Sequence, residues 1–409
     1  MINSKEIFEI ALNLQSPWYV KSIELEEDEN GKKSLHLNLD FIRGSRFSID
    51  EEADCKVHDT VNRIWRHLNF FEHECYIHCR VPRIRTSKSV RQVEVPWARI
   101  GSGFTLLFEA FSMHLIENEM PVNKVGKTLN EYPNRVWTIF NYWVSISYSE
   151  AEHSEVTQLG IDEVSSKKGH TYITHAVDLA ERRVVHATVG KDKETIKNIR
   201  EYLETKGCPA DQIKDVCIDL SPSFISGVMG EFKKAAITFD RFHVKQMLQR
   251  AMDTVRKAER KEHDILKGHK YLFLKNNVNL SARQKQQRDE LIELLPNIGK
   301  AYRLKVLFDD FWEFETTEEA AAFLTFWCDL VDESKIFPLI KFANSVKSHW
   351  SGILKYIESK ISNGILEGIN NKIKLAIRRA RGYRNSKNLI NMIYFIAGKL
   401  KFDYPLYST

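Results

Sequence analysis

The sequence predicts an α+β protein of several domains, because 409 residues exceed what one compact core usually organises. Residues 157–243 contain short apolar, β-branched runs in the order β-β-β-α-β-α-β. Residues 244–356 then turn wholly helical, and a last helical region occupies residues 357–400. This order is typical of an RNase H-like domain that is split by an all-helical insertion domain.

Composition narrows the class of protein. Apolar residues make up 43% and charged residues 28% of the chain, as in globular proteins. We find no apolar run long enough for a membrane span and no secretory leader, so we expect a cytoplasmic, nucleoid-associated protein without membrane partners. The net charge is only +5, but residues 368–401 contain nine Lys or Arg and no Asp or Glu. An acid-free basic stretch favours a polyanionic partner such as DNA.

Residues 1–50 are expected to form an N-terminal β-hairpin region after a short helix. The segments "KSIELEED" and "KKSLHLNLDF" alternate apolar and polar residues around a Glu-Asn-Gly turn. Such alternation on both sides of a turn containing Gly31 predicts two paired strands.

Residues 51–98 are predicted to form a small zinc-binding β module. Cys55 and His58 form one close pair, and Cys75 and Cys79 form a second pair after a 16-residue interval. Two such pairs joined by a loop suit one structural, tetrahedral Zn²⁺. Three more histidines compete for the histidine position: His67, His73 and His78. The alternative is a reduced, metal-free module with buried thiols.

Residues 104–150 are predicted to form a helix-turn-helix DNA-binding domain. An amphipathic helix is followed by two shorter helices around a turn near Asn130. In a helix-turn-helix the second helix enters the major groove, so Asn134 and Arg135 would face DNA. A plain helical linker fits the spacing equally well. Core packing or a subunit interface would account for the aromatic residues of these helices: Phe108, Phe111, Trp137, Phe140 and Trp143.

Three acids mark a candidate catalytic site. Asp162 interrupts the strand "QLGIDE", Asp219 ends the strand "DVCIDL", and Glu367 lies on the late helix "SNGILEGINNKIK". Buried strands rarely carry unpartnered carboxylates, because a buried unpaired charge is costly. Three converging carboxylates would form an oxygen-rich pocket suited to two Mg²⁺ or Mn²⁺ ions. Each acid alone has an ordinary interpretation as a strand-end or surface charge.

Asp240 follows the fifth strand and is the reserve candidate ligand. With His243 it is predicted to support the acids from just outside the metal site.

The late helix has two faces that can be read from its spacing. Asn363, Glu367, Asn370, Asn371, Lys374 and Arg378 recur at steps of three and four and form one polar stripe. An apolar stripe that includes Leu366 and Ile373 would pack on the sheet. An ordinary solvated face would explain the period but not the amides. We expect DNA contacts from Asn371, Lys374, Arg378, Arg379, Arg381 and Arg384.

Several long segments resemble the DDE transposases of bacterial insertion sequences, in the ISL3 family, over roughly residues 50–400. The resemblance rests on "HLNFFEHECYIHCRVPR", "VPWARIGSGFTLLFEA", "GIDEVSSKKGHTYITHAVDL", "FDRFHVKQMLQRAMDTVRK" and "SNGILEGINNKIKLAIRRARGYRN". It implies an N-terminal zinc-binding domain, a helix-turn-helix and a split RNase H-like catalytic domain with Asp162, Asp219 and Glu367 as metal-binding triad. The family's first zinc knuckle is usually Cys-x-x-Cys, whereas this chain has Cys55-x-x-His58.

The resemblance also implies a substrate and a reaction. The enzyme would bind the terminal inverted repeats of an insertion sequence, cleave the DNA and join the freed 3′-hydroxyl to target DNA. Each end needs an active site, so we expect a homodimer or a larger synaptic assembly. The alternatives are a structure-specific nuclease on the same fold and a non-catalytic DNA-binding descendant. A tyrosine recombinase using Tyr383 is disfavoured, since the acidic triad would then have no role.

Overall fold

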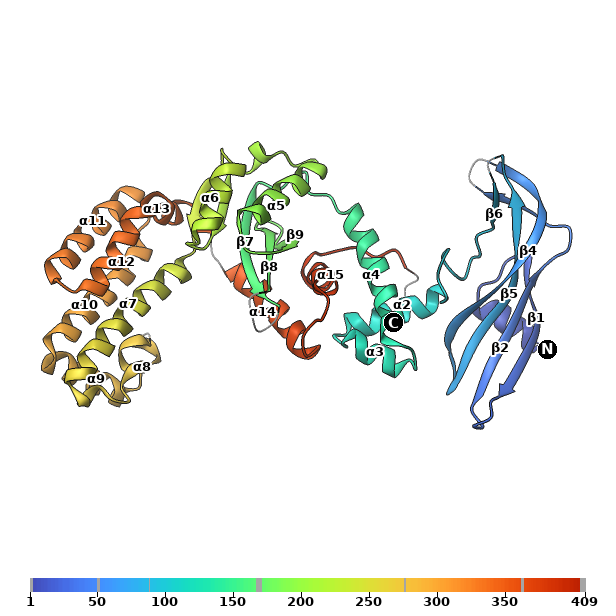
Figure 1. The fold of residues 1–409 in the computed structure, drawn as a ribbon, viewed down its shortest axis with the longest axis horizontal. Helices are drawn as coiled ribbons and strands as arrows, with labels where there is room; N and C mark the ends of the chain where they lie inside the picture. Colours follow the sequence, from blue (N-terminus) through green and yellow to red (C-terminus); the bar gives the residue numbers. More distant parts are fainter. Residues whose placement is uncertain are drawn as a thin grey trace. The chain divides into compact units, whose positions relative to one another are not determined.

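The computed structural model describes residues 3–49, 52–87, 89–166, 171–275, 277–361 and 364–404. The chain divides into two compact units (Figure 1). The first unit comprises Met1–Trp143 with Lys401–Thr409, and the second comprises Val144–Leu400. Within the described ranges, every helix is too short or too polar to cross a membrane.

The first unit is built on a six-stranded sheet in the order β1-β2-β5-β4-β3, with β6 paired to β5. The elements are α1 (Ser4–Ala11), β1 (Trp18–Glu27), β2 (Lys33–Phe41), β3 (Arg46–Ile49), β4 (Glu52–Phe70), β5 (His73–Arg85) and β6 (Val90–Gln92). The predicted hairpin is present, because β1 and β2 pair antiparallel from Glu27 and Lys33 outward. Strand β2 also pairs with β5, so residues 1–50 and 51–98 share one sheet and are not separate domains.

The structure does not support the predicted zinc-binding module, because these residues form long strands. Cys75 and Cys79 are four apart on β5, which puts both on the same face, and they are 1% and 4% exposed in the core of the sheet. Cys79 lies opposite Arg63, whereas Cys55 is eight residues away along β4, roughly 26 Å at the rise of a strand. His58 is exposed on β4 beside a break in the register.

The two thiols lie in the core of the sheet. Burial raises the pKa of Cys75 and of Cys79 to about 12. The alternative ligand His67 is hydrogen-bonded outside the cysteine pairs, since its Nδ1 lies 2.8 Å from the Thr105 hydroxyl.

Three helices complete the first unit and start the second: α2 (Leu106–Glu117), α3 (Val122–Thr128) and α4 (Pro133–Glu150). A tight turn at Asn130, with φ of 54°, joins α3 to α4 where it was predicted. A Cβ on Gly126 would lie 2.9 Å from the Glu131 carbonyl oxygen, so glycine allows the turn to fold back onto α3. Phe108, Phe140 and Trp143 are buried within the chain, which assigns them to packing.

The second unit contains a five-stranded sheet in the order β11-β10-β7-β8-β9. The strands are β7 (Gln158–Ser165), β8 (Tyr172–Asp178), β9 (Arg183–Val189), β10 (Asp215–Ile218) and β11 (Ala236–Phe239). Strands β7 to β9 form an antiparallel meander, and β10 and β11 run parallel to β7. This is the arrangement expected for an RNase H-like domain.

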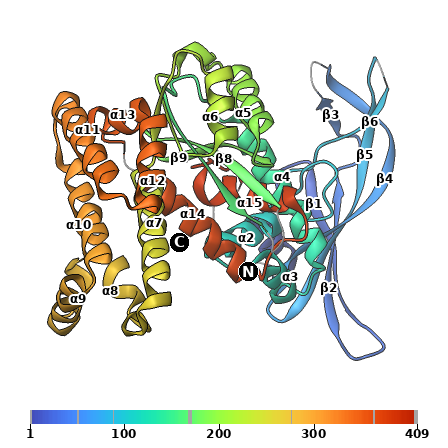
Figure 2. The same cartoon turned by 60° about the vertical axis from the view of Figure 1, so that its left-hand side comes forward.

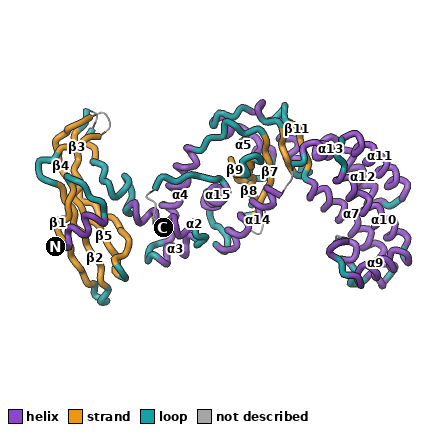
Figure 3. The backbone as a smooth tube through the Cα atoms, turned by 180° about the vertical axis from the view of Figure 1, so that it is seen from behind, coloured by secondary structure: helices purple, strands orange, loops and turns teal. Residues whose placement is uncertain are grey.

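Helices cover this sheet on its faces and along its β9 edge (Figures 1 and 3). They are α5 (Lys193–Thr205), α6 (Pro222–Glu231), α14 (Gly364–Arg379) and α15 (Ser386–Ala397). Helix α15 lies along β9, where the Tyr394 hydroxyl hydrogen-bonds both the N–H and the C=O of Ala187. These bonds satisfy the edge strand and block its pairing with another chain.

The predicted insertion is a bundle of helices between β11 and α14, with α7, α10, α11 and α12 side by side (Figure 2). Its helices are α7 (Arg241–Glu262), α8 (Lys270–Leu274), α9 (Ala282–Leu294), α10 (Pro296–Asp310), α11 (Thr317–Ser334), α12 (Phe337–Ser348) and α13 (Trp350–Ser359). A capping box joins Ser281 and Gln284 at the start of α9. Helices α12 and α13 meet at His349.

The insertion is packed against the sheet and is continuous with its core. Helix α13 lies against β11, and a Cβ on Gly352 would be 2.5 Å from the Phe239 ring. One cluster of buried apolar side chains runs from β7 through α7 to α13. The insertion therefore shares one core with the strands.

We predict that Gly126→Ala destabilises the protein by about 1–3 kcal/mol, the usual cost of forcing a methyl group into a filled space. Chemical denaturation measures this loss. Gly368→Ala is the matched control, because no atom lies within 4 Å of the added Cβ and alanine favours a helix over glycine. Equal stability of the two variants would contradict the close packing of the turn.

Candidate active site

The three predicted acids line one pocket of about 300 Å³ in the second unit. Asp162 lies on β7, and Asp219 follows β10 directly. Since Cys217 of β10 pairs with Gly160 of β7 in a parallel register, two steps further bring Asp219 level with Asp162. Glu367 reaches the same pocket from the first turn of α14.

Successive side chains of β7 point to opposite faces of the sheet, and this alternation determines which face carries the site. Leu159 and Ile161 join the apolar cluster on one face. Gly160 faces the other way, and a Cβ there would lie 2.9 Å from Leu366 of α14. Asp162 is two residues on and shares this face, where the Asn370 Nδ2 donates a hydrogen bond of 2.6 Å to its Oδ2.

The carboxylates are oriented by backbone donors and repel one another. The Glu163 N–H donates to Asp162 Oδ1 at 2.7 Å, and the Ser221 N–H donates to Asp219 Oδ1 at 2.9 Å. Glu163 also lines the pocket. Its pKa is raised by burial and further by the charges of Asp219 and Asp162. The pocket therefore has an excess of negative charge.

Asp240 and His243 lie in the same pocket wall, next to each other, as predicted. Asp240 caps α7 by accepting from the Phe242 N–H at 2.8 Å, and its second oxygen is 2.5 Å from Nδ1 of His243. The hydrogen bond to Asp240 raises the pKa of His243 against the opposing effect of burial. The imidazole therefore favours its charged form beside the acids.

The polar stripe of α14 lines the pocket over about two helical turns, from Glu367 to Lys374. Asn371 and Lys374 line the pocket beyond Glu367. Asn363 lies outside the described residues. The other predicted DNA contacts are exposed but do not form one continuous helix: Arg378 and Arg379 end α14, Arg381 adopts a left-handed φ of 57°, and Arg384 precedes α15.

Four residues around the acids were not assigned to the site from the sequence. Glu163, Asn370 and Phe242 line the pocket. His175 lies directly opposite Asp162 on β8, is fully buried, and burial lowers its pKa to about 4. The sequence does signal Asn370 through the amide-rich stripe, but it gives no sign of His175 until the register of β7 and β8 is known.

The donor set fits a hard divalent cation. Five carboxylates line the pocket: Asp162, Glu163, Asp219, Asp240 and Glu367. Of these, Asp240 has an ion-pair partner among the described side chains. Carboxylate oxygens are the ligands that Mg²⁺ and Mn²⁺ prefer. Over the described part of the chain, no three His, Cys, Asp or Glu side chains are close enough to hold an ion as they stand.

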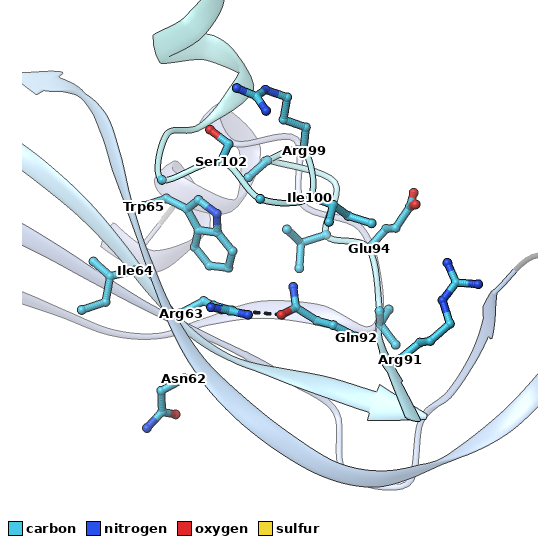
Figure 4. A pocket seen from close by; sticks show the side chains of 15 residues that line it. Asn62, Arg63, Ile64, Trp65, Arg91, Gln92, Glu94, Arg99, Ile100 and Ser102 are labelled. Atoms are coloured by element: carbon cyan, nitrogen blue, oxygen red, sulfur yellow. Dashed lines mark hydrogen bonds between the residues drawn. The ribbon is translucent and has the colours of Figure 1, made fainter. Parts of the chain in front are cut away.

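A larger cavity, of about 590 Å³, lies in the first unit between β4 and residues 91–103 (Figure 4). Arg63 donates from Nε to the Gln92 side-chain oxygen at 2.9 Å across it, and Trp65 forms part of the wall. Glu94 is the single carboxylate among its lining residues. This cavity therefore lacks the acid cluster that distinguishes the smaller pocket.

The helix-turn-helix residues differ in their freedom to meet DNA. Asn134 is exposed at the start of α4. Arg135 is also exposed, but its Nη1 contacts Glu131 at 2.8 Å and its guanidinium lies 4.3 Å from the Phe104 ring centre. DNA would have to compete with Glu131 for this arginine.

Tyr383 does not have the environment of a nucleophile. It is 7% exposed, and burial raises the pKa of its hydroxyl. A recombinase tyrosine must reach a phosphate, so this placement agrees with the preference for the acids.

An acid-lined pocket on an RNase H-like sheet and a separate helix-turn-helix define the class of protein, a DNA-processing enzyme of the DDE type. The family model described as a transposase of the DDE ISL3 type matches residues 159–393, more than half of the chain. A second model, described as the helix-turn-helix domain of transposase family ISL3, matches residues 93–144. The chain belongs to the ISL3 family of transposases.

Curated relatives extend over nearly the whole chain. It is 28% identical to a transposase for insertion sequence element IS1001 of Bordetella parapertussis, covering 90% of this chain and 92% of the relative. It is 26% identical to a transposase for insertion sequence element IS1557 of Mycobacterium tuberculosis, covering 94% and 93%. The HTLV-2 integrase catalytic core domain aligns with 34% of this chain and 98% of that chain at 12% identity, with a TM-score of 0.16, which is too low to establish a common fold.

We predict that the pair of Asp240 and His243 makes stability depend on pH. The pKa of His243 is raised in the folded protein. The pair therefore contributes fully to the free energy of unfolding below the pKa of an unfolded histidine, about 6.5. This contribution is lost as pH rises through the pKa of His243 in the folded protein. Asp240→Asn keeps the helix cap and should flatten this dependence. Thermal unfolding from pH 5 to 9, with the imidazole pKa measured by NMR, checks it; an unchanged imidazole pKa in the variant would contradict the assignment.

Proposed function

We propose that this chain is an active transposase of a bacterial insertion sequence, which cleaves DNA at the element's ends and joins them to target DNA. The observation that carries the proposal is the convergence of Asp162, Asp219 and Glu367 on one pocket of an ISL3-family fold. The relatives named as insertion-sequence transposases support the substrate class.

The site would hold two Mg²⁺ or Mn²⁺ ions through Asp162, Asp219 and Glu367. When bound, such ions supply positive charge to the reacting phosphate and acidity to the attacking hydroxyl group. The neighbouring carboxylates favour this binding, because the mutual repulsion that raises the pKa of Glu163 is relieved by a cation. Asn370 would keep Asp162 in one rotamer through its hydrogen bond.

The reaction has two displacements at phosphorus. A water oxygen attacks the phosphodiester at the element's end, and the bond to the 3′-oxygen breaks, which leaves a 3′-hydroxyl and a 5′-phosphate. The 3′-hydroxyl then attacks a target phosphodiester and displaces the target's own 3′-oxygen. Neither step needs a covalent bond to protein. Lys374, on the pocket wall, would bind the phosphate beside the reacting bond.

The remaining parts would recognise and pair the ends. Helix α4 would present Asn134 and Arg135 to the terminal inverted repeats, and the exposed arginines after Glu367 would hold the backbone. Two ends need two active sites, so we propose a homodimer or larger assembly on DNA.

We predict that Asp162→Asn, Asp219→Asn and Glu367→Gln each reduce Mg²⁺-dependent cleavage by more than about 100-fold, since lost outer-shell partners alone cost 10–100-fold. End binding should stay near wild type. The assay uses duplexes cut from the DNA that flanks the reading frame, and it scores cleaved and joined products. Glu293→Gln, on the exposed face of α9, is the control.

The products separate the competing functions. Cleavage without joining would indicate a nuclease on the same fold. Binding without cleavage in any divalent metal would indicate a non-catalytic DNA-binding protein, and wild-type rates in a triad variant would remove that residue from the site.

We predict that Arg378→Ala weakens DNA binding on all sequences alike and lowers the slope of log affinity against log salt by about 0.9, the value for one lost phosphate contact. Fluorescence anisotropy from 50 to 300 mM salt measures the slope. Lys341→Ala, an exposed lysine of α12, is the control. Identical slopes for the two variants would show that Arg378 does not contact a DNA phosphate.

A further inference from the structure

The exposed face of α7 carries a groove that lies outside the acid pocket. It has a volume of about 290 Å³ and lies between α7 and α8. Its walls include Gln246, Gln249, Arg250, Thr254, Lys257 and Lys270. These side chains are hydrogen-bond donors, and three of them are cations.

The groove carries net positive charge, because its acid is already neutralised. Asp253 is the carboxylate among its lining residues. Its Oδ1 is 2.7 Å from Nη2 of the buried Arg256, and its Oδ2 is 2.9 Å from Lys257. Arg250 contacts the uncharged amide of Gln246 at 2.5 Å. A surface of this kind suits an anion with many acceptor oxygens, such as a phosphodiester chain.

The same helix connects this groove to the acids. Asp240 caps α7 and His243 lines the acid pocket, both at its start. His243, Gln246, Arg250 and Lys257 follow at steps of three, four and seven, which places them on one face of the helix. Figure 2 shows α7 running from the sheet into the bundle as one straight helix.

We propose that this face of α7 is a DNA-backbone track, which holds the duplex whose end occupies the acid pocket. The inference rests on the proposed function, and it adds the insertion to the parts that bind substrate. Helical rise places Arg250 and Lys257 about 10 and 21 Å along the axis from His243. Each DNA strand advances about 3.4 Å per nucleotide, so the track meets phosphates roughly three to six base pairs from the reacting bond.

Helix α8 extends the cationic border of the track. Lys270 lies 5.6 Å and Lys275 lies 5.9 Å from the ring centre of Tyr271, which is 59% exposed. The ring places two ammonium groups on the solvent side of α8, where they can contact the same DNA backbone.

The test combines Arg250→Ala, Lys257→Ala and Lys270→Ala in one variant and compares it with Lys300→Ala/Lys341→Ala. The two control lysines are exposed on α10 and α12 and do not line the groove. End duplexes reach twelve base pairs past the cleavage site on one side and either two or twelve on the side that would follow α7. Affinity is measured against salt without divalent metal, and each single substitution is measured as well in case the triple variant misfolds.

For the long duplex, the triple variant should lower the salt slope by about 2.7, at about 0.9 per lost phosphate contact, and the control pair should not. For the short duplex, variant and wild type should bind alike. If the triple variant and the control pair had equal slopes of log affinity against log salt on the long duplex, the proposed DNA track would be refuted. Wild-type protein that binds the long duplex through this face but never cleaves it with Mg²⁺ would instead remove the proposed function.

Discussion

The arrangement of the site depends on the contact between α14 and the middle of β7. Gly160 has no side chain, so Leu366 can pack directly on the strand at that point. One turn later Asn370 hydrogen-bonds Asp162, which joins residues 208 positions apart in the sequence. Glu367 lies between these two contacts and is therefore held over the ends of β7 and β10. A larger residue at 160 would lift the helix and its acid from the other two carboxylates.

The helical insertion is part of the catalytic unit's core and does not merely interrupt the fold. It leaves the sheet through α7, whose cap is Asp240, and it returns through α13, which packs on β11. The first of these attachment points, at the start of α7, lies in the wall of the acid pocket. One apolar cluster joins the strands to the bundle, whereas α14 is positioned by its own packing on β7 and α15. The same attachment places the outer face of α7 next to the reacting groups.

Much of the second unit follows from local patterns. Alternation and β-branched runs predicted the five strands, and the acids stand out because carboxylates are rare in buried strands. His175 and Glu163 escaped notice because their place in the site depends on register and on which face a strand turns inward. The helix after Glu367 ends earlier than its charge pattern suggested, since Arg381 takes a left-handed conformation.

The first unit shows how a spacing can mislead. Cys75 and Cys79 were interpreted as a metal knuckle, but a spacing of four in a strand also puts two side chains on one buried face. The local sequence does not distinguish a metal knuckle from a strand of thirteen residues. The pairing of β5 with both β2 and β4 shows that these residues form a strand. The family resemblance also implies a zinc domain here, at residues that form a hydrophobic core in this structure.

The central claim is that the acid pocket performs metal-dependent chemistry on a DNA phosphate. The most direct measurement replaces a non-bridging oxygen of the scissile phosphate with sulfur and compares cleavage by the wild-type protein in Mg²⁺ and in Mn²⁺. Magnesium binds sulfur poorly and manganese accepts it, following their order of ligand softness. Sulfur should therefore slow cleavage in Mg²⁺, and Mn²⁺ should restore the rate. Equal slowing in both metals would contradict direct contact between the metal site and the reacting phosphate.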